Sequence, residues 1–194
     1  MLSKIKPKVE KAFYPLAKVI GSYIHPNFIT ALGLLIAVMY LVAATLHPEN
    51  GLLVLGLFLL STIMDMVDGA VARVTGRTSK VGALLDSTSD RVADSIYAYS
   101  AYAVGICSPI ESFLLLVLAY MVSYVRARAE GLGLKMAGVG LMERGERVLA
   151  FFTVLISRYL LGVRVAYFLL VALIILTGFT VIQRMLYAAK ELRG

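Results

Sequence analysis

The sequence is poor in residues that could cross-link the chain or keep it in solution. Its single cysteine, Cys107, excludes an intrachain disulfide, and no histidine stands near it at the spacing of a metal site. Only 16% of the 194 residues are charged. No hydrophilic stretch between Asn27 and Gln183 is long enough to form a separate core, which excludes a soluble domain carried on one membrane anchor.

The residues that are abundant indicate a membrane protein. Hydrophobic residues make up 60% of the chain, and the mean hydropathy of +0.84 lies well above that of a soluble domain of this size. The net charge of +7 is compatible with nucleic-acid binding, but in this composition it is better explained by membrane topology and anionic headgroups. We therefore expect one membrane-embedded domain over residues 1–194, with the lipid bilayer as a partner and no nucleic acid.

Apolar segments recur along the chain at lengths that suit membrane-spanning helices. Two of them reach the roughly 18 uninterrupted apolar residues of a spanning helix, and the other four carry their charges at one end. The sequence predicts an all-α integral membrane protein with six transmembrane helices, over residues 28–46, 51–73, 82–105, 112–125, 148–157 and 165–182.

The basic residues fall almost entirely on one side of this arrangement. Only Arg158 and Arg164 lie on the other side, so the positive-inside rule identifies the richer side as the cytoplasm. We expect a multi-pass protein of the cell membrane, with both termini and the active site on the cytoplasmic side. Residues 1–24 have apolar residues on one face and lysines elsewhere, which predicts a juxtamembrane amphipathic helix on the inner leaflet; a plain basic tail is the alternative.

All five aspartates of the chain lie within residues 65–94, in the predicted second and third helices. An ionised carboxylate near hydrocarbon is costly, so it needs a charge partner, a metal ion or a watery cavity. Asp65 and Asp68 share a helical face at i and i+3, as do Asp86 and Asp90 at i and i+4. The short connection at residues 74–80 makes the two helices an antiparallel hairpin, which can set the two pairs opposite each other.

Clustered carboxylates repel one another unless a cation neutralises them, and ligands that are all oxygen select hard divalent ions. We therefore predict a site for Mg²⁺ or Mn²⁺ with four ligands: Asp65, Asp68, Asp86 and Asp90. The alternative is a structural salt-bridge network between the aspartates and the cations nearby, namely Arg73, Arg77, Lys80 and Arg91.

Small residues in the same hairpin indicate a second ligand beside the metal. Gly69, Ala72 and Gly82 lack large side chains, which lowers helix propensity but lets a flat ligand approach the backbone. Arg73 and Arg77 stand at the helix end, where guanidinium groups can contact phosphates. A metal ion beside such a slot suggests a nucleotide diphosphate.

The hairpin resembles the signature of the CDP-alcohol phosphatidyltransferases. All eight fixed positions agree at every spacing, in the order Asp65-x-x-Asp68-Gly69-x-x-Ala72-Arg73, eight residues, Gly82, three residues, Asp86, three residues, Asp90. The segment from Pro26 to Thr30 is also similar to the one that these enzymes carry before their first span, and the layout of six spans is similar over nearly the whole chain.

The resemblance implies a reaction and a role for each matching residue. A phosphatidyl-type group would pass from a CDP-linked lipid to the hydroxyl of a small polar alcohol, with release of CMP. Asp65, Asp68, Asp86 and Asp90 would hold the metal, and Asp90 would also be the catalytic base. The nucleotide and the CDP-lipid would be bound by Thr30, Asp68, Gly69, Ala72, Arg73, Arg77 and Gly82. Family members also suggest a homodimer, and Asp94 lies outside the signature.

Residues 123–147 are similar to the inositol-phosphate branch of that family. Relatives carry a pattern like S-Y-x-[KR]-A-R-A-E followed by E-R-P-E-R; here Arg126 stands where lysine is common, and Gly145 replaces the proline. The resemblance implies inositol 1-phosphate as the acceptor, its phosphate bound by Arg126, Arg144, Arg147 and Arg184. Converging cations suit a dianionic phosphate. Glycerol 3-phosphate is the alternative acceptor.

Two readings outside this enzyme class stay open. A divalent-cation transporter would also carry aspartates in the membrane, although here the carboxylates cluster toward one side and no polar residues continue through the outer halves of the spans. A metal-stapled scaffold would need the carboxylates for folding alone, so that Asp90→Asn would leave its function unchanged.

Overall fold

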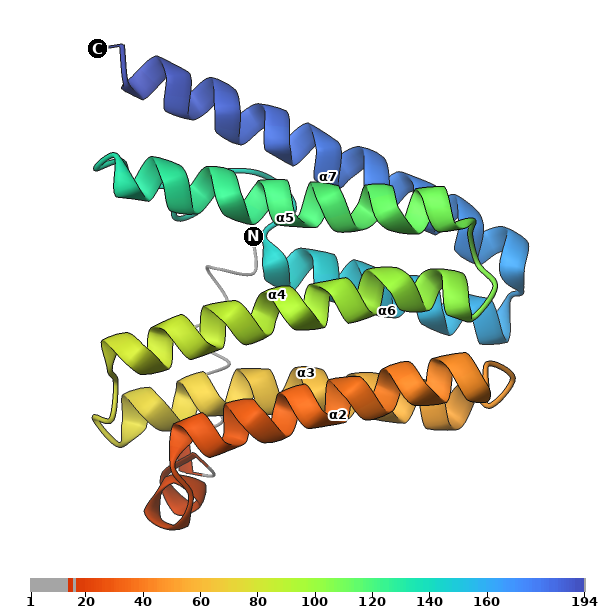
Figure 1. The fold of residues 1–194 in the computed structure, drawn as a ribbon, viewed down its shortest axis with the longest axis horizontal. Coiled ribbons are helices and arrows are strands. Elements are labelled where there is room, and N and C mark those ends of the chain that lie inside the picture. The colour runs from red at the N-terminus through yellow and green to blue at the C-terminus, as the bar shows by residue number, and fades with distance from the viewer. Residues whose placement is uncertain (1–13, 16, 194) are drawn as a thin grey trace. The chain divides into compact units, whose positions relative to one another are not determined.

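The computed structural model describes residues 14, 15 and 17–193, and these residues form an all-helical structure (Figure 1). Its long helices are α2 (Pro26–Leu46), α3 (Gly51–Val74), α4 (Lys80–Ala103), α5 (Pro109–Gly131), α6 (Arg144–Leu160) and α7 (Val163–Glu191). Residues 17–23 add a short helical segment before α2. The prediction for residues 1–24 falls mostly outside the described residues.

Each predicted range coincides with one long helix, and the ends differ for physical reasons. Helix α4 ends at Ala103, two residues before the predicted end at residue 105, because Gly105 has a positive φ of 73° that breaks the helical backbone. The last helix continues to Glu191, well beyond the apolar range, because backbone hydrogen bonding extends into polar residues that hydropathy does not mark.

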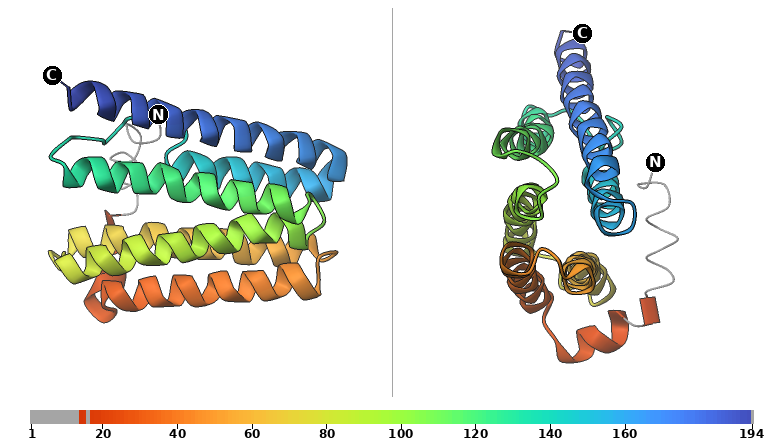
Figure 2. Two further views of the ribbon diagram at one scale, coloured as in Figure 1. Left: turned by 45° about the horizontal axis from the view of Figure 1, so that its top comes forward. Right: turned by 90° about the vertical axis from the view of Figure 1, so that its right-hand side faces the viewer.

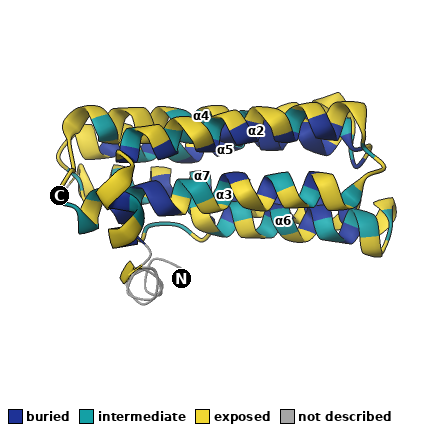
Figure 3. Ribbon diagram, turned by 90° about the horizontal axis from the view of Figure 1, so that it is seen from below, coloured by how far each residue is buried: buried dark blue, intermediate teal, exposed yellow. Residues whose placement is uncertain are grey.

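Within the described residues, α2, α3, α5 and α7 are long and apolar enough to cross a membrane. These helices carry large exposed apolar side chains, such as Leu52 at 87% and Phe168 at 65% exposure, which suit contact with lipid. Figure 3 colours the ribbon by burial and shows exposed positions along the helices. The other two helices are more polar: α4 contains the second group of aspartates, and α6 has 17 residues with arginines at both ends. The structure is that of a multi-pass membrane protein.

The chain divides into two compact units, which meet in sequence at Val104 and Gly105. In the first unit α2 packs against both α3 and α4, and in the second unit α7 packs against both α5 and α6 (Figure 2). The prediction of a single membrane domain over residues 1–194 stays a prediction.

The interior of the first unit is built from aromatic rings and paired hydroxyl groups. The rings of Tyr40, Phe58 and Tyr97, one from each helix, pack edge to face or tilted with centroids 4.7–5.8 Å apart. The hydroxyl groups of Tyr40 and Ser100 are 2.6 Å apart, and those of Ser61 and Tyr97 are 2.8 Å apart. These pairings satisfy polar groups that would otherwise be costly to bury, and they join α4 to both α2 and α3.

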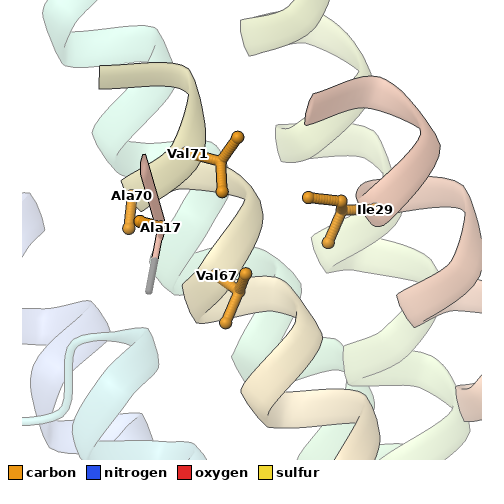
Figure 4. Packing of buried hydrophobic residues seen from close by; sticks show 5 residues of the cluster. All are labelled: Ala17, Ile29, Val67, Ala70 and Val71. Carbon is orange, nitrogen blue, oxygen red and sulfur yellow. The ribbon is translucent and has the colours of Figure 1, made fainter. Parts of the chain in front are cut away.

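A smaller apolar cluster lies at the end of α3 that carries the aspartates. It consists of Ala17, Ile29, Val67, Ala70 and Val71, all buried (Figure 4). Ala17 is the first residue of the short helical segment over residues 17–23 and Ile29 lies on α2, so this cluster packs that segment and α2 against one face of α3. The packing leaves the neighbouring Asp68 in a dry environment, with 3% of its surface exposed.

Candidate active site

Carboxylates from α3 and α4 meet near the turn that joins the two helices. One oxygen each from Asp65, Asp86 and Asp90 lies within 4.8 Å of the others. The antiparallel hairpin produces this meeting, because Asp65 stands near the end of α3 while Asp86 and Asp90 stand near the start of α4. Three carboxylate oxygens at such separations suit a hard divalent cation, which neutralises their repulsion and accepts oxygen ligands.

Asp68 stands beside this group, and its two oxygens have different surroundings. Oδ2 accepts a hydrogen bond from the Thr30 hydroxyl at 2.6 Å. Oδ1 is buried and has no hydrogen-bond partner among the described residues. Asp65 and Asp86 are near enough to Asp68 to interact with it electrostatically. A buried carboxylate oxygen without a hydrogen bond is costly, and a cation shared with the neighbouring aspartates would satisfy it.

The pair of Arg91 and Asp90 represents the salt-bridge alternative at this site. Arg91 Nη1 lies 3.6 Å from Asp90 Oδ2, and both side chains are partly exposed. A long ion pair with solvent access contributes little stability. The approach of the carboxylate oxygens of Asp65, Asp86 and Asp90 to one another is compatible with a metal site.

The glycines of the hairpin lie under polar side chains, as a ligand slot requires. A Cβ atom on Gly69 would lie 3.2 Å from Arg73 Nη1, so the Arg73 guanidinium extends back over this glycine. A Cβ atom on Gly82 would lie 3.1 Å from Ser79 Oγ and 3.3 Å from Asn27 Oδ1. In the sequence, Asn27 stands out only as part of the segment from Pro26 to Thr30, at the start of α2, with no role of its own.

Arg77 has a structural contact in addition to the predicted phosphate contact. Its Nη1 donates to the backbone carbonyl of Gly21 at 3.2 Å. Gly21 packs so closely on α3 that a Cβ atom there would overlap Thr75. Arg77 therefore ties the helical segment over residues 17–23 to the end of α3, and its contact with a nucleotide stays a prediction.

The four arginines predicted to bind the acceptor belong to the second unit. Arg126 Nε donates to Glu130 Oε1 at 2.9 Å, one turn along α5. Arg147 is buried in the first turns of α6 and donates from Nη1 to the Met142 carbonyl at 3.2 Å. Arg144 is half-buried at the first position of α6. Arg184 is 2% exposed on α7.

Hydrogen bonds of Arg184 organise the connection between α5 and α6. Its Nε donates to the Val139 carbonyl at 2.9 Å, and its Nη1 donates to the Val122 carbonyl at 2.7 Å. Glu143 Oε1 lies 4.0 Å from Arg184 Nη2 and accepts from the Gly138 backbone at 2.9 Å. The sequence marked the arginines here but not the role of Glu143, since an acidic residue beside basic ones is common on a protein surface.

Several of these charges act on one another. Arg126 and Arg147 are near enough to Arg184 to repel it, while Glu130 and Glu143 are near enough to attract it. The second unit therefore contains a cluster of basic groups around a buried arginine, partly neutralised by two glutamates. Phosphate binding by these arginines stays a prediction.

Comparison with known proteins identifies one family. The family model described as CDP-alcohol phosphatidyltransferase matches residues 23–183. The chain is 48% identical over 138 residues to the archaetidylinositol phosphate synthase of Aeropyrum pernix, covering 71% of this chain and 70% of the relative. It is 37% identical over 193 residues to the archaetidylinositol phosphate synthase of Pyrococcus horikoshii, covering 99% and 98% of the two chains.

The fold is similar to a solved structure of the same kind of protein. The phosphatidylinositol phosphate synthase of Mycobacterium tuberculosis with CDP-DAG bound has a TM-score of 0.75 at 26% identity, over 92% of this chain and 94% of that chain. The same protein in complex with manganese and citrate has a TM-score of 0.74 at 26% identity, over 90% and 87%.

Proposed function

Because the chain belongs to the CDP-alcohol phosphatidyltransferase family, we propose that it transfers a phosphatidyl-type group from a CDP-linked lipid to inositol 1-phosphate. The donor is CDP-diacylglycerol or CDP-archaeol, and CMP is released. The observation that carries the proposal is the meeting of Asp65, Asp86 and Asp90, whose oxygens lie within 4.8 Å of one another. Similarity to archaetidylinositol phosphate synthases supports inositol phosphate as the acceptor.

The residues of the hairpin fit a divalent ion, Mg²⁺ or Mn²⁺. The donor set is entirely carboxylate oxygen, and Asp68 Oδ1 is buried with no hydrogen bond from the described residues. Asp65, Asp68, Asp86 and Asp90 would hold the ion. When bound, it offsets the negative charge of the diphosphate and of the leaving CMP.

Asp90 acts as the general base of the transfer. Its carboxylate takes the proton of the acceptor hydroxyl as that oxygen forms a bond to the lipid-linked phosphorus. The bond from this phosphorus to the bridging oxygen breaks, and CMP leaves with the electron pair. The half-buried position of Asp90 at the edge of the carboxylate group supports this role, because a base needs both the substrate and a route for the proton.

The donor nucleotide is held by the hairpin and by the start of α2. Gly69, Ala72 and Gly82 carry no large side chain, and Arg73 lies over Gly69, where its guanidinium can meet a phosphate. Thr30, Asp68 and Arg77 complete this set of nucleotide contacts.

The acceptor phosphate is bound by the basic cluster of the second unit. Arg126, Arg144 and Arg147 supply charge, and Arg184 orders the connection from which α6 begins. Several guanidinium groups suit a dianionic phosphate monoester, which serine, glycerol or free inositol lacks.

We also propose six spans, with both termini and the active site on the cytoplasmic side, and a homodimer. The 17 residues of α6 extend about 26 Å at about 1.5 Å per residue. This is slightly less than a hydrocarbon core of about 30 Å, so the arginines at its two ends would lie at the interfaces.

An acceptor panel tests the function. Purified protein in lipid is given CDP-archaeol or CDP-diacylglycerol with inositol 1-phosphate, glycerol 3-phosphate, serine or free inositol, and CMP release is measured with Mg²⁺ and with Mn²⁺. We expect CMP release with inositol 1-phosphate. Release with glycerol 3-phosphate alone would contradict the acceptor assignment. Metal uptake into sealed liposomes without any CDP-lipid would instead favour the transporter.

A further inference from the structure

We propose that Thr30 is a positioning residue for the metal ligand Asp68. Its hydroxyl group holds one carboxylate oxygen of Asp68, so that the other oxygen is presented to the divalent cation. The inference rests on the proposed function, because the cation is the one proposed there. It adds to the metal site a residue of α2, a helix that contributes no carboxylate to the site.

The hydrogen bond between the two side chains is well defined. Thr30 Oγ1 lies 2.6 Å from Asp68 Oδ2, the short distance typical of a hydroxyl donating to an ionised carboxylate. The Pro26 carbonyl, one helical turn back on α2, is 3.3 Å from the same hydroxyl. A hydroxyl has one proton to donate, and the shorter contact to Asp68 takes it.

The surroundings of Asp68 make this donor important. The carboxylate is 3% exposed, and its helix neighbour Val67 and the Ile29 side chain of α2 belong to the buried apolar cluster (Figure 4). Bulk water therefore cannot replace a missing hydrogen bond. The Thr30 hydroxyl distinguishes the two oxygens of Asp68, because it engages Oδ2 and leaves Oδ1 without a hydrogen bond among the described residues.

A fixed rotamer of Asp68 matters because the hydrogen-bond partner of a metal ligand holds that ligand in the orientation in which it binds the metal. Loss of such a partner typically lowers metal affinity or activity by about 10- to 100-fold. The donation to Asp68 also limits what Thr30 can do for a nucleotide, since its oxygen can then only accept a hydrogen bond. The nucleotide contact predicted for Thr30 and the positioning role therefore have different consequences, which an experiment can separate.

The test measures Mn²⁺ binding to the purified full-length protein in detergent, by electron paramagnetic resonance, without nucleotide. We expect Thr30→Val to weaken Mn²⁺ binding by about 10- to 100-fold and Thr30→Ser to restore it. If Thr30→Val does not fold, Mn²⁺ binding is measured on Thr30→Ala, which also lacks the hydroxyl. Thr45→Val is the matched control, because the Thr45 hydroxyl on the same helix donates only to the Leu41 carbonyl in the same i−4 arrangement.

Activity measurements add a second readout. If Thr30 positions a metal ligand, excess Mn²⁺ should restore the rate of CMP release by Thr30→Val. If Thr30 serves the nucleotide alone, KM for the CDP-lipid rises and added metal does not restore it, which overturns the proposal.

Asp68→Asn separates failure of this inference from failure of the proposed function. Weak Mn²⁺ binding by Asp68→Asn together with wild-type binding by Thr30→Val and Thr30→Ala would disprove the positioning role and leave the metal site intact. Unchanged Mn²⁺ binding by Asp68→Asn would refute the proposed metal site itself.

Discussion

At the scale of single residues, the molecule pairs almost every polar side chain that it buries in the first unit. The hydroxyl groups of Tyr40 and Tyr97 each meet a serine on another helix, and Asp68 meets Thr30. Lipid and apolar side chains offer no hydrogen bonds, so each unpaired group would cost stability. Against this background, the approach of three carboxylates to one another suits the metal site proposed above.

Removal of one carboxylate from this group should abolish metal binding without unfolding the protein. We expect Asp86→Asn to weaken Mn²⁺ binding by more than the roughly 10- to 100-fold typical of outer partners, with CMP release lost in parallel. Asp86 is exposed, so the amide adds no buried strain. Glu49→Gln, which removes an exposed carboxylate from the turn before α3, is the control. Calorimetric titration and thermal unfolding measure both effects, and retained binding in Asp86→Asn would contradict the metal site.

The single cysteine should react slowly with thiol reagents at neutral pH. Burial, together with repulsion of a thiolate by the nearby Glu111 carboxylate, raises the pKa of the Cys107 thiol to about 11. Only the thiolate is nucleophilic, so the alkylation rate of the folded protein should keep increasing with pH up to about 11. The same chain unfolded in detergent is the control and should react as an ordinary thiol. Rapid alkylation of the folded protein at neutral pH would contradict this prediction.

At the scale of elements, the connection between α5 and α6 is the most constrained segment of the second unit. Arg184 donates to the Val139 carbonyl. Thr180 Oγ1 accepts a hydrogen bond from the Met142 backbone N–H, and Glu143 Oε1 accepts one from the Gly138 backbone N–H. These bonds set the direction in which α6 starts, and with it the positions of the arginines of its first turns.

Gly140 should be intolerant of any side chain. Its φ is +99°, and a Cβ atom would lie 2.6 Å from Thr180 Cγ2. Gly138→Ala is the matched control, because Gly138 has φ of +80° and nothing within 4 Å of the added atom. We expect backbone strain of about 1 kcal/mol in both variants and a further cost of roughly 1–3 kcal/mol for the overlap in Gly140→Ala.

Thermal unfolding in detergent compares the two glycine variants. Gly140→Ala should have the lower Tm and the weaker affinity for the acceptor, since the loop ahead of Arg144 shifts. Equal Tm values for the two variants would show that the connection relaxes around the methyl group.

At the scale of the whole molecule, the long helices divide into apolar ones and more polar ones. Four of the long helices of the described residues are apolar enough to span a membrane on their own, while α4 and α6 are more polar and carry Asp86 and Asp90, and Arg144 and Arg147, respectively. Polar helices of this kind persist in a membrane when their charged faces turn toward protein, ligand or water. Catalysis at a membrane surface needs such helices, because the lipid donor and the polar acceptor come from different solvents.

The predicted topology is testable with engineered cysteines in a Cys107→Ala background. Glu49→Cys lies in the turn between α2 and α3, and Lys190→Cys lies near the end of α7. In intact cells, a membrane-impermeant maleimide should label Glu49→Cys only, and permeabilised cells should label both. Labelling of Lys190→Cys in intact cells would invert the topology.

The sequence by itself determined where the helices lie, and it marked the carboxylates of the candidate site. Apolar length and the position of charges predict where each helix lies, because both are local properties, and the spacing from Asp65 to Asp90 marks two helical faces of carboxylates. The same spacing does not distinguish Asp68 from its neighbours.

The tertiary structure decided which residues far apart in the sequence contact one another. Packing of α2 on α3 brings Thr30 to Asp68, so this carboxylate is turned toward a hydroxyl while Asp65, Asp86 and Asp90 approach one another. In the same way, Arg77 reaches a carbonyl of residues 17–23, and Arg184 reaches carbonyls on α5 and in the following connection. Such contacts join residues 38 to 62 positions apart, and only the packing of helices against one another brings them within hydrogen-bond distance.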